Sequence, residues 1–271
     1  MIDYRPNWIL RPGTHDHHVV KEVYDDNCYR VPDDMSGFCV VDIGAHIGSF
    51  SLACLARGAN RIVAYEAHKD NAACAKMNLR RFFKTDDPRT PVEKNFTLHN
   101  LAVIGDARLD QPQVFVNATP ETYSDFLMTG GHNTYGDSGL AVSTLHISNI
   151  ADHVKKLCFS RSLLKLDCEG AEHEILASEN TDWQAFDFIV GEGHSVLPLH
   201  NDLTSRMTHD GTVDTSPSAL FRRISDLGFA AVDIVPCATD KNLYLFFAAR
   251  RADEAFWRPR WQAVGDPRLR R

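Results

Sequence analysis

Short apolar runs alternate with amphipathic stretches along this chain, and that alternation constrains its fold more than any other feature. FCVVDIG at 38–44 is an apolar run with a carboxylate near its end, and AHIGSFSLACLARGAN after it has helical apolar spacing and a glycine near its end. Residues 61–67 predict a second buried strand, and residues 70–83 predict an amphipathic helix. Since alternating strands and helices form a mainly parallel sheet with helices on both faces, the sequence predicts an α/β domain.

The alternation continues through the second half of the chain. Further strands are predicted over 96–103, 141–147, 162–167 and 186–194, and helices over 150–156, 169–178 and 216–229. The last two predicted strands, 230–236 and 243–250, are separated by a short turn and form an antiparallel hairpin. The prediction is a mainly parallel seven-stranded sheet that ends in this C-terminal hairpin.

Two extensions flank the predicted domain, which covers residues 37–250. Residues 1–36 are polar, and because His17–Val23 alternates like a strand and Asn27–Val31 could pair with it, they predict an N-terminal β-hairpin. Residues 251–271 form an Arg-rich tail, which we interpret as a solvated extension. At 271 residues the chain is only slightly longer than a usual single-core domain, which favours one domain with extensions.

Composition and charge exclude several classes of protein. Hydrophobic residues make up 44% and charged residues 24% of the chain, which excludes a disordered protein. The net charge of −7 argues against a nucleic-acid partner. Seven cysteines without a CxxC pair are typical of reduced thiols, and the sequence contains neither a signal peptide nor an apolar run of membrane-spanning length. These features predict a cytoplasmic location.

The strongest local motif is DIGAHIG at 42–48, where the first predicted strand ends and a helix begins. Ligands of open α/β sheets bind at this edge. Gly44 allows a tight turn and a close approach to a ligand, and Gly48 allows close packing of the helix. Glu66 ends the next strand, 22 positions after Gly44, where a carboxylate can accept hydrogen bonds from both ribose hydroxyls. The motif and Glu66 together predict a nucleoside site.

The identity of the nucleoside depends on what this motif lacks. A dinucleotide fingerprint has a second glycine where this chain has His46, and the carboxylate of Asp42 would repel a phosphate. S-adenosylmethionine contains ribose and adenine but no phosphate, and Asp42 could accept hydrogen bonds from its ammonium group, directly or through water. We therefore favour this cofactor. A non-catalytic S-adenosylmethionine-binding module and an NAD-dependent oxidoreductase stay open as alternatives.

Four segments resemble one known family, the FkbM-type methyltransferases: VVDIGAHIGSFSL, IVAYEA, NLAV at 100–103 and, most specifically, LKLDCEGAEHEIL at 164–176. The resemblance covers roughly residues 37–194. It implies a class I, Rossmann-like methyltransferase fold that uses S-adenosylmethionine and usually methylates a hydroxyl oxygen of a sugar or natural product. The family commonly has asparagine in place of His46 and proline in place of Ala67, but neither change removes a carboxylate.

The resemblance also implies roles for individual residues. Residues that would bind the cofactor are Asp42, Gly44, His46, Gly48, Glu66, Asn100 and Asp167. Candidate catalytic residues are Asp167, Glu169, Glu192 and His194. Asp167 and Glu169 would face the reaction site, although carboxylates at these positions could instead only stabilise the N-terminus of the following helix. Residues 195–217 and the two extensions lie outside the resemblance, and we expect them to set the choice of acceptor.

The chemistry narrows the catalytic roles. Methyl transfer from a sulfonium is an in-line displacement, so the protein must mainly align the acceptor and, for a hydroxyl, remove its proton. Asp167 and Glu169 are expected to organise the acceptor, and His194 is a possible base because its unperturbed pKa is near neutrality. Asp167, Glu169 and His173 could hold a divalent cation, but an ion pair between Glu169 and His173 is the commoner arrangement, and no metal is predicted.

Overall fold

The structure is a computed structural model, and it describes residues 7–83, 94–116, 139–195, 214–237 and 242–257. Most of the 195–217 loop and of the Arg-rich tail lies outside these ranges. None of the helices within the ranges is both long and apolar enough to cross a membrane.

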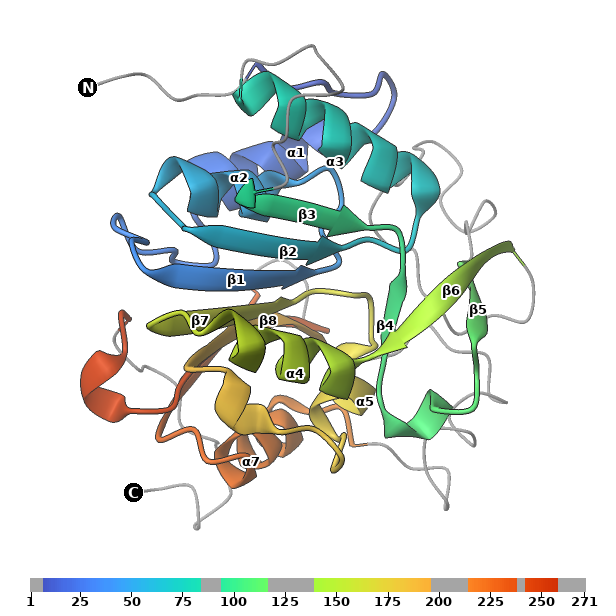
Figure 1. Cartoon of the computed structure of the whole chain (residues 1–271). Helices are drawn as coiled ribbons and strands as arrows, with labels where there is room; N and C mark the ends of the chain where they lie inside the picture. Colours follow the sequence, from blue (N-terminus) through green and yellow to red (C-terminus); the bar gives the residue numbers. More distant parts are fainter. Residues whose placement is uncertain (1–6, 84–93, 117–138, 196–213, 238–241, 258–271) are drawn as a thin grey trace.

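The centre of the molecule is a seven-stranded sheet (Figure 1). In spatial order its strands are β3 (Phe96–His99), β2 (Arg61–Tyr65), β1 (Phe38–Ile43), β7 (Arg161–Leu166), β8 (Phe188–His194), β10 (Leu243–Ala249) and β9 (Ala231–Pro236). Only β10 runs antiparallel to its neighbours, and the other adjacent pairs are parallel. The predicted mainly parallel sheet with a C-terminal antiparallel hairpin is therefore confirmed.

Helices cover both faces of this sheet because successive strand residues point to opposite sides. Val40 of β1 packs in one core with α2 (Ser49–Ala56) and α3 (Lys69–Phe82). Its neighbour Val41 packs in the other core, with α4 (Ile147–Leu157), α5 (Glu172–Leu176) and α7 (Pro217–Asp226). The short 3-10 helix η4 (Trp183–Ala185) precedes β8 and belongs to the second core. The doubly wound arrangement brings the carboxyl ends of the parallel strands to one edge.

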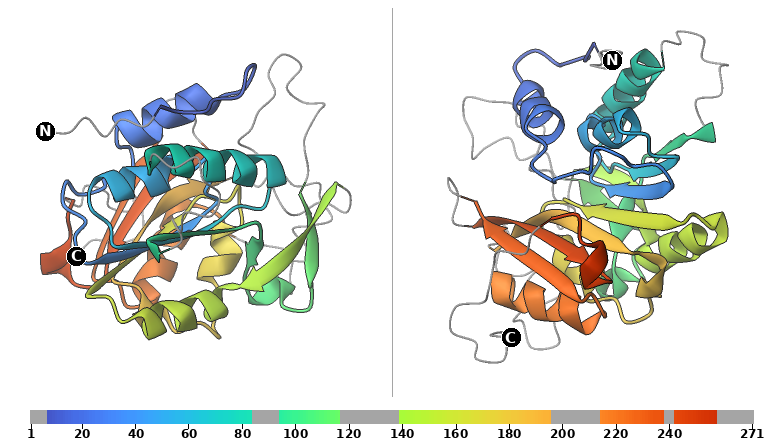
Figure 2. Two further views of the ribbon diagram at one scale, coloured as in Figure 1. Left: turned by 45° about the horizontal axis from the view of Figure 1, so that its top comes forward. Right: turned by 90° about the vertical axis from the view of Figure 1, so that its left-hand side faces the viewer.

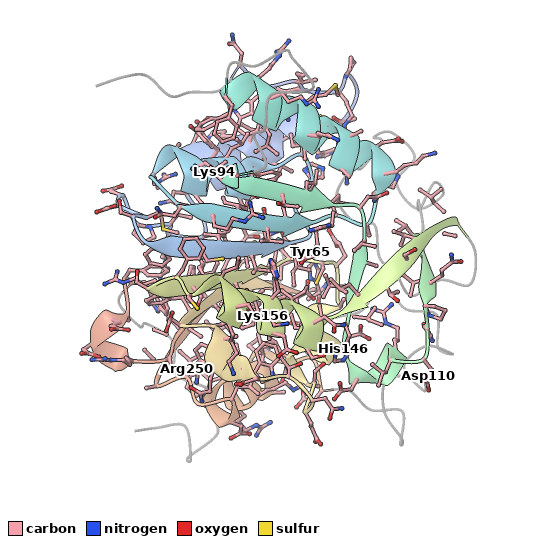
Figure 3. The ribbon with its side chains drawn as sticks, viewed as in Figure 1. Tyr65, Lys94, Asp110, His146, Lys156 and Arg250 are labelled. Atoms are coloured by element: carbon pink, nitrogen blue, oxygen red, sulfur yellow. The ribbon has the colours of Figure 1, made fainter. Side chains whose placement is uncertain are left out.

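A second, three-stranded sheet departs from the prediction. It consists of β4 (Ala102–Ile104), β6 (Leu140–His146) and β5 (Gln113–Val116), and the 3-10 helix η3 (Asp106–Arg108) follows β4. The single strand predicted over 96–103 is wrong, because the chain leaves the main sheet after His99. The Asn100 side chain donates hydrogen bonds to the carbonyls of Glu66 and Ala67, at 2.8 and 2.9 Å, and so fixes this departure. Figure 3 labels Tyr65, whose ring stacks on His99, and His146 at the end of β6.

The N-terminal segment is helical, so the predicted β-hairpin is wrong. The helix α1 (Asp16–Val19) continues into a π-helix, η1 (Val20–Asp25). Val20 packs against Ile47 and Cys74, and both views of Figure 2 show this segment on the same side of the sheet as α2 and α3. The valines of this segment have a high β propensity, but here they pack against the sheet as part of a helix.

The start of the C-terminal tail also packs on the domain. After the 3-10 helix η5 (Ala252–Glu254), the Trp257 side chain is buried and its ring lies 5.7 Å from that of Phe247. The described part of the tail is therefore not a free extension.

Candidate active site

A cavity opens at the carboxyl edge of β1, β2, β7 and β8, where the sequence predicts a ligand. The loops after β1 and β2 contribute His46 and Glu66 to its wall, and the loop after β7 together with β8 contributes Asp167, Glu169 and Glu192. Because β2 and β8 are the outer two of these four strands in the sheet, the two groups line opposite ends of the cavity. With Gly44, six of the predicted site residues therefore lie around one space, as expected for a doubly wound sheet.

Gly44 occupies the point where the loops after β1 and β7 touch. Its φ is +75°, and a Cβ added there would lie 1.8 Å from the backbone oxygen of Asp167. The Asp167 N–H donates to the carbonyl of Ile43 at 3.2 Å, which keeps the two loops together. Glycine is therefore required at this position because the backbone comes so close to the loop after β7. Gly44 also lines the cavity.

Gly48 is required for a different reason from the one predicted. An added Cβ would meet Ala75 of α3 at 3.5 Å, an ordinary contact, so helix packing leaves room for a side chain. Its φ of +89° is the actual constraint, because this left-handed conformation precedes the first residue of α2 and other residues adopt it only with strain. Gly48 does not line the cavity.

Glu66 is held at the cavity by main-chain donors. Its carboxylate accepts hydrogen bonds from the N–H groups of His46 at 2.7 Å and His68 at 2.8 Å, and Asn71 Nδ2 lies at 3.5 Å. Burial raises the pKa of Glu66 to about 7, although the two main-chain donors act in the opposite direction. Asn100, another predicted cofactor residue, is not in the cavity wall and instead holds the turn that follows Glu66.

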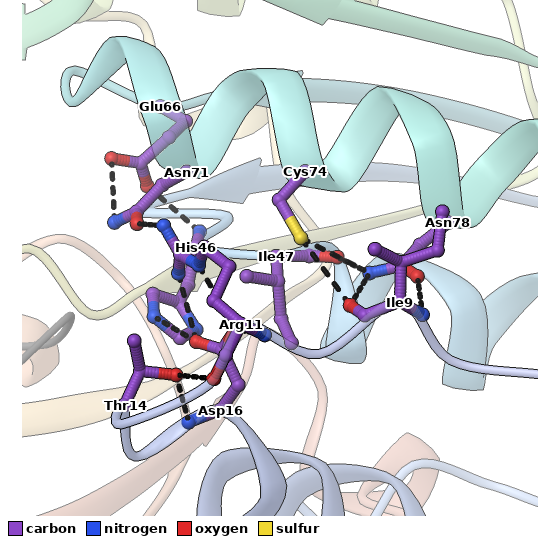
Figure 4. Close-up of polar contacts among 10 residues, drawn as sticks. All are labelled: Ile9, Arg11, Thr14, Asp16, His46, Ile47, Glu66, Asn71, Cys74 and Asn78. Atoms are coloured by element: carbon purple, nitrogen blue, oxygen red, sulfur yellow. Dashed lines mark hydrogen bonds and ion pairs between the residues drawn. The ribbon is translucent and has the colours of Figure 1, made fainter.

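The N-terminal segment is bonded to this end of the cavity (Figure 4). Arg11 forms an ion pair with Asp16 at 2.8 Å and donates to Asn71 Oδ1 at 2.8 Å, while His46 Nε2 lies 3.7 Å from Asp16 Oδ1. Burial raises the pKa of Asp16, but the hydrogen bonds from Arg11 outweigh it and lower the value to about 2. Burial lowers the pKa of His46 to about 4, so its ring is neutral at physiological pH. No sequence motif indicated this network.

Asp42 lies behind the cavity wall. It is fully buried, accepts a hydrogen bond from Ser51 Oγ at 2.6 Å and lies 3.3 Å from Lys165 Nζ. Lys165 Nζ is also 3.4 Å from Asp167 Oδ2. Burial lowers the pKa of Lys165, but Asp167 and Asp42 raise it overall. An effect of Asp42 on a bound molecule would therefore pass through the Lys165 ammonium.

The N-terminal segment also forms part of the other end of the cavity. The buried Tyr29 donates from its hydroxyl to Asp167 Oδ2 at 2.9 Å. Its backbone is held in a turn because the Asn27 side chain bonds to both N–H and C=O of Val31. Glu22 of η1 lines the cavity as well. Because these residues precede the segments that resemble the family, the sequence motifs gave no signal for them.

Glu192 extends from β8 into the same end. Burial raises its pKa to about 8, and the negative charge of Asp167 contributes in the same direction. Its carboxylate makes no hydrogen bond or ion pair with the residues that the structure describes, whereas Asp167 is bonded to Tyr29 and Lys165. Among the predicted site carboxylates, Glu192 is therefore the one with the greatest freedom to exchange a proton with a ligand.

His194 has a different environment from the one expected of a base. Its Nε2 lies 3.3 Å from Glu169 Oε2 and its Nδ1 lies 3.5 Å from Glu172 Oε1, and the side chain is not in the cavity wall. Burial alone would lower the pKa of His194, but the two carboxylates raise it well above 6.5. A protonated imidazole has no free lone pair for a proton, and this environment argues against His194 as the base.

The arrangement proposed for a cation is not formed. Glu169 and His173 do not share a helical face, because α5 begins at Glu172, and His173 Nε2 instead contacts the carbonyl of His194 at 3.0 Å. Over the residues described, no group of three or more His, Cys, Asp or Glu side chains is arranged to hold a metal ion.

Comparisons with known proteins place the chain in a family. The model of the FkbM methyltransferase domain matches residues 42–216, which is more than half of the chain. No curated protein sequence matches. Among solved structures, FkbM methyltransferase from Methylobacillus flagellatus KT is 15% identical with a TM-score of 0.43, over 84% of this chain and 47% of that one.

Two further solved structures are similar at the same level. EvdMO1 is 10% identical with a TM-score of 0.41, over 86% of this chain and 40% of that chain. The O-methyltransferase from Bacillus cereus in complex with SAH is 9% identical with a TM-score of 0.42, over 90% and 84%. This chain thus spans less than half the length of EvdMO1 and of the M. flagellatus protein. From the family match and the order of the main sheet, the fold is that of class I methyltransferases, and the chain belongs to the FkbM methyltransferase family.

Proposed function

We propose that this protein transfers a methyl group from S-adenosylmethionine to a hydroxyl oxygen of a sugar or small natural product. When bound, the cofactor supplies an activated methyl group on a sulfonium. The residues at the strand edge would bind the nucleoside, align the acceptor and remove its proton.

The observation that carries this proposal is the position of Glu66. Its carboxylate is already oriented by two main-chain N–H groups, lies at the end of β2 and lines the cavity. A carboxylate at this place accepts hydrogen bonds from vicinal ribose hydroxyls. His46 occupies the position of a dinucleotide-binding glycine and its side chain lines the cavity, which disfavours a pyrophosphate there.

The other end of the cavity supports a hydroxyl acceptor. A general base works best when its pKa is close to the operating pH, and the pKa of Glu192 is about 8. Asp167 is held by Tyr29 and Lys165, so its role would be to orient the acceptor and to keep the pKa of Glu192 high. We therefore assign Glu192 as the base and Asp167 as an orienting group.

Calorimetric titration of the full chain with S-adenosylmethionine tests the cofactor. At pH 8, where Glu66 is mostly ionised, Glu66→Ala should weaken binding by about 1.5–3 kcal/mol, the range for hydrogen bonds to a charged group. The matched control is Asp70→Ala, which removes an exposed carboxylate four residues further along and outside the cavity wall. Equal affinities of wild type and Glu66→Ala, or measurable binding of NADH, would contradict the assignment.

The acceptor can be identified directly from a mixture of metabolites. Incubation of the protein with methyl-labelled S-adenosylmethionine and a metabolite extract, followed by identification of the labelled product, should give a methyl ether of a sugar or small natural product. A labelled amine, carbon or nucleic acid would contradict the proposal of O-methylation.

A further inference from the structure

A chain of three side chains leads to the end of the cavity that Asp167, Glu169 and Glu192 line, which we call the acceptor end. It runs from Glu172, which is fully buried at the start of α5, through His194 at the end of β8 to Glu169, which lines the cavity. The two nitrogens of His194 lie 3.5 Å from Glu172 Oε1 and 3.3 Å from Glu169 Oε2. Only Glu169, the last member of this chain, reaches the cavity.

Glu172 also holds the backbone around Glu169. Its carboxylate accepts hydrogen bonds from the N–H groups of Cys168 at 2.6 Å and Gly170 at 2.8 Å, the two neighbours of Glu169 in the sequence. Glu169 itself has a φ of +56°, in the left-handed region. A non-glycine residue adopts this strained conformation only when its surroundings hold it there.

We propose that Glu172 is a positioning residue for methyl transfer, which acts through His194 to hold the Glu169 carboxylate at the acceptor end of the cavity. This inference rests on the proposed function, since it assigns the acceptor to that end. Glu172 fixes both parts of Glu169, its backbone through the two amides and its side chain through the imidazole. A group that must align an acceptor within a fraction of an ångström needs this kind of support.

The charges around His194 agree with this arrangement. The titratable groups that face it are Glu169, Glu172, His173 and Glu192. Burial raises the pKa of Glu172, but the charges of His194 and His173 and the hydrogen bonds from His194 and the Cys168 N–H together lower it to about 2. Each buried charge is therefore stabilised by the other, and removal of Glu172 leaves the buried His194 with Glu169 as its remaining carboxylate partner.

The loss of the Glu172 charge would have consequences at the cavity. Without it, the buried His194 would release its proton at a lower pH, and the neutral ring would donate only one hydrogen bond. Glu169 would then lose its cationic partner, and Glu192 would lose a nearby positive charge that lowers its pKa. Glu172 thus affects the Glu169 and Glu192 carboxylates through His194, although it does not line the cavity itself.

The test is an NMR titration of the His194 imidazole in the full chain with labelled histidine, assigned by comparison with His194→Asn. In the wild type we expect the midpoint of His194 to lie well above that of a free imidazole. In Glu172→Gln its midpoint should fall by at least about one pH unit, because a buried histidine loses an adjacent carboxylate. Glu174→Gln, which removes a buried carboxylate of the same helix bonded to Arg108, is the matched control and should leave the titration unchanged.

The outcomes separate this inference from the proposed function. A wild-type His194 that titrates near pH 6.5, or an equal midpoint in Glu172→Gln, overturns the positioning role even if methyl transfer is found. If Glu172→Gln does not fold, Glu169→Gln should lower the midpoint in the same direction, and an unchanged midpoint there overturns the role as well. Failure of S-adenosylmethionine to bind overturns the proposed function, whatever His194 does.

Discussion

The two ends of the cavity are constructed differently. At the cofactor end, Glu66 is held by the main-chain N–H groups of His46 and His68, both within about twenty residues of it in the chain. At the acceptor end, Asp167 is held by Tyr29, which is 138 residues away, and by Lys165. The Glu66 carboxylate is thus held by donors of one strand–helix–strand unit, whereas the Asp167 carboxylate is held by a side chain from a distant part of the chain. Mutations at the Glu66 end should therefore change the affinity for the cofactor, and mutations at the Asp167 end should change the rate of methyl transfer.

The largest expected effect is on turnover, at the acceptor end. Glu192→Gln keeps the shape of the side chain but removes the base, so it should lower turnover by roughly 10²-fold or more and leave S-adenosylmethionine affinity within a few-fold. Steady-state kinetics with the identified acceptor and calorimetry measure the two quantities. Glu179→Gln, an exposed residue outside this cavity, is the control. Full turnover in Glu192→Gln would transfer the role of base to Asp167 or Glu169.

The second effect concerns pH. As a base, Glu192 must be ionised, so turnover should fall as the pH decreases below about 8. Asp167→Asn removes a neighbouring negative charge, which favours the ionised form of Glu192 and lowers its pKa. The acid limb of the pH–rate profile should therefore move to lower pH in this variant, by about one unit. An unmoved limb would show that the titrating group is not coupled to Asp167.

The same difference explains what the sequence could predict. The DIGAHIG loop and Glu66 were found because strand ends, glycines and the spacing between two consecutive strands are local patterns, and the main sheet was correctly predicted for the same reason. Tyr29 and Glu22 were missed because nothing near them in the sequence shows that their segment folds onto the sheet edge. The valines of that segment favour a strand by propensity, but the segment is helical and its Val20 packs on Ile47 and Cys74.

His194 illustrates a second limit of the sequence. Its residue type suggests a base near neutrality, but its charge state depends on Glu169 and Glu172, which approach it only after β7, α5 and β8 have packed. The carboxylate with the suitable pKa is Glu192, and burial beside Asp167 is the cause. Environments of this kind are properties of the fold and cannot be read from residue type.

A smaller effect on turnover is expected from the N-terminal segment, which contributes Tyr29 to the acceptor end. Tyr29→Phe removes one hydrogen bond to Asp167 and keeps the buried ring and its edge-to-face contact with Phe50. We expect turnover to fall about tenfold, which corresponds to a hydrogen bond to a charged group, with little change in cofactor affinity. Tyr24→Phe, in the same segment but outside the cavity wall, is the control. Equal turnover in both variants would mean that Tyr29 only packs.

The smallest expected effect is that of metal removal. A divalent cation needs about six oxygen ligands, but Lys165 and Tyr29 already contact the Asp167 carboxylate and His194 contacts that of Glu169. The cationic side chains of Lys165 and His194 thus already compensate the charges that a metal ion would otherwise neutralise. Treatment with EDTA should leave the methyl-transfer rate unchanged within error. A rate that EDTA abolishes and magnesium or manganese restores would instead require Asp167 and Glu169 to exchange these partners for the ion, and would make the acceptor end a metal site.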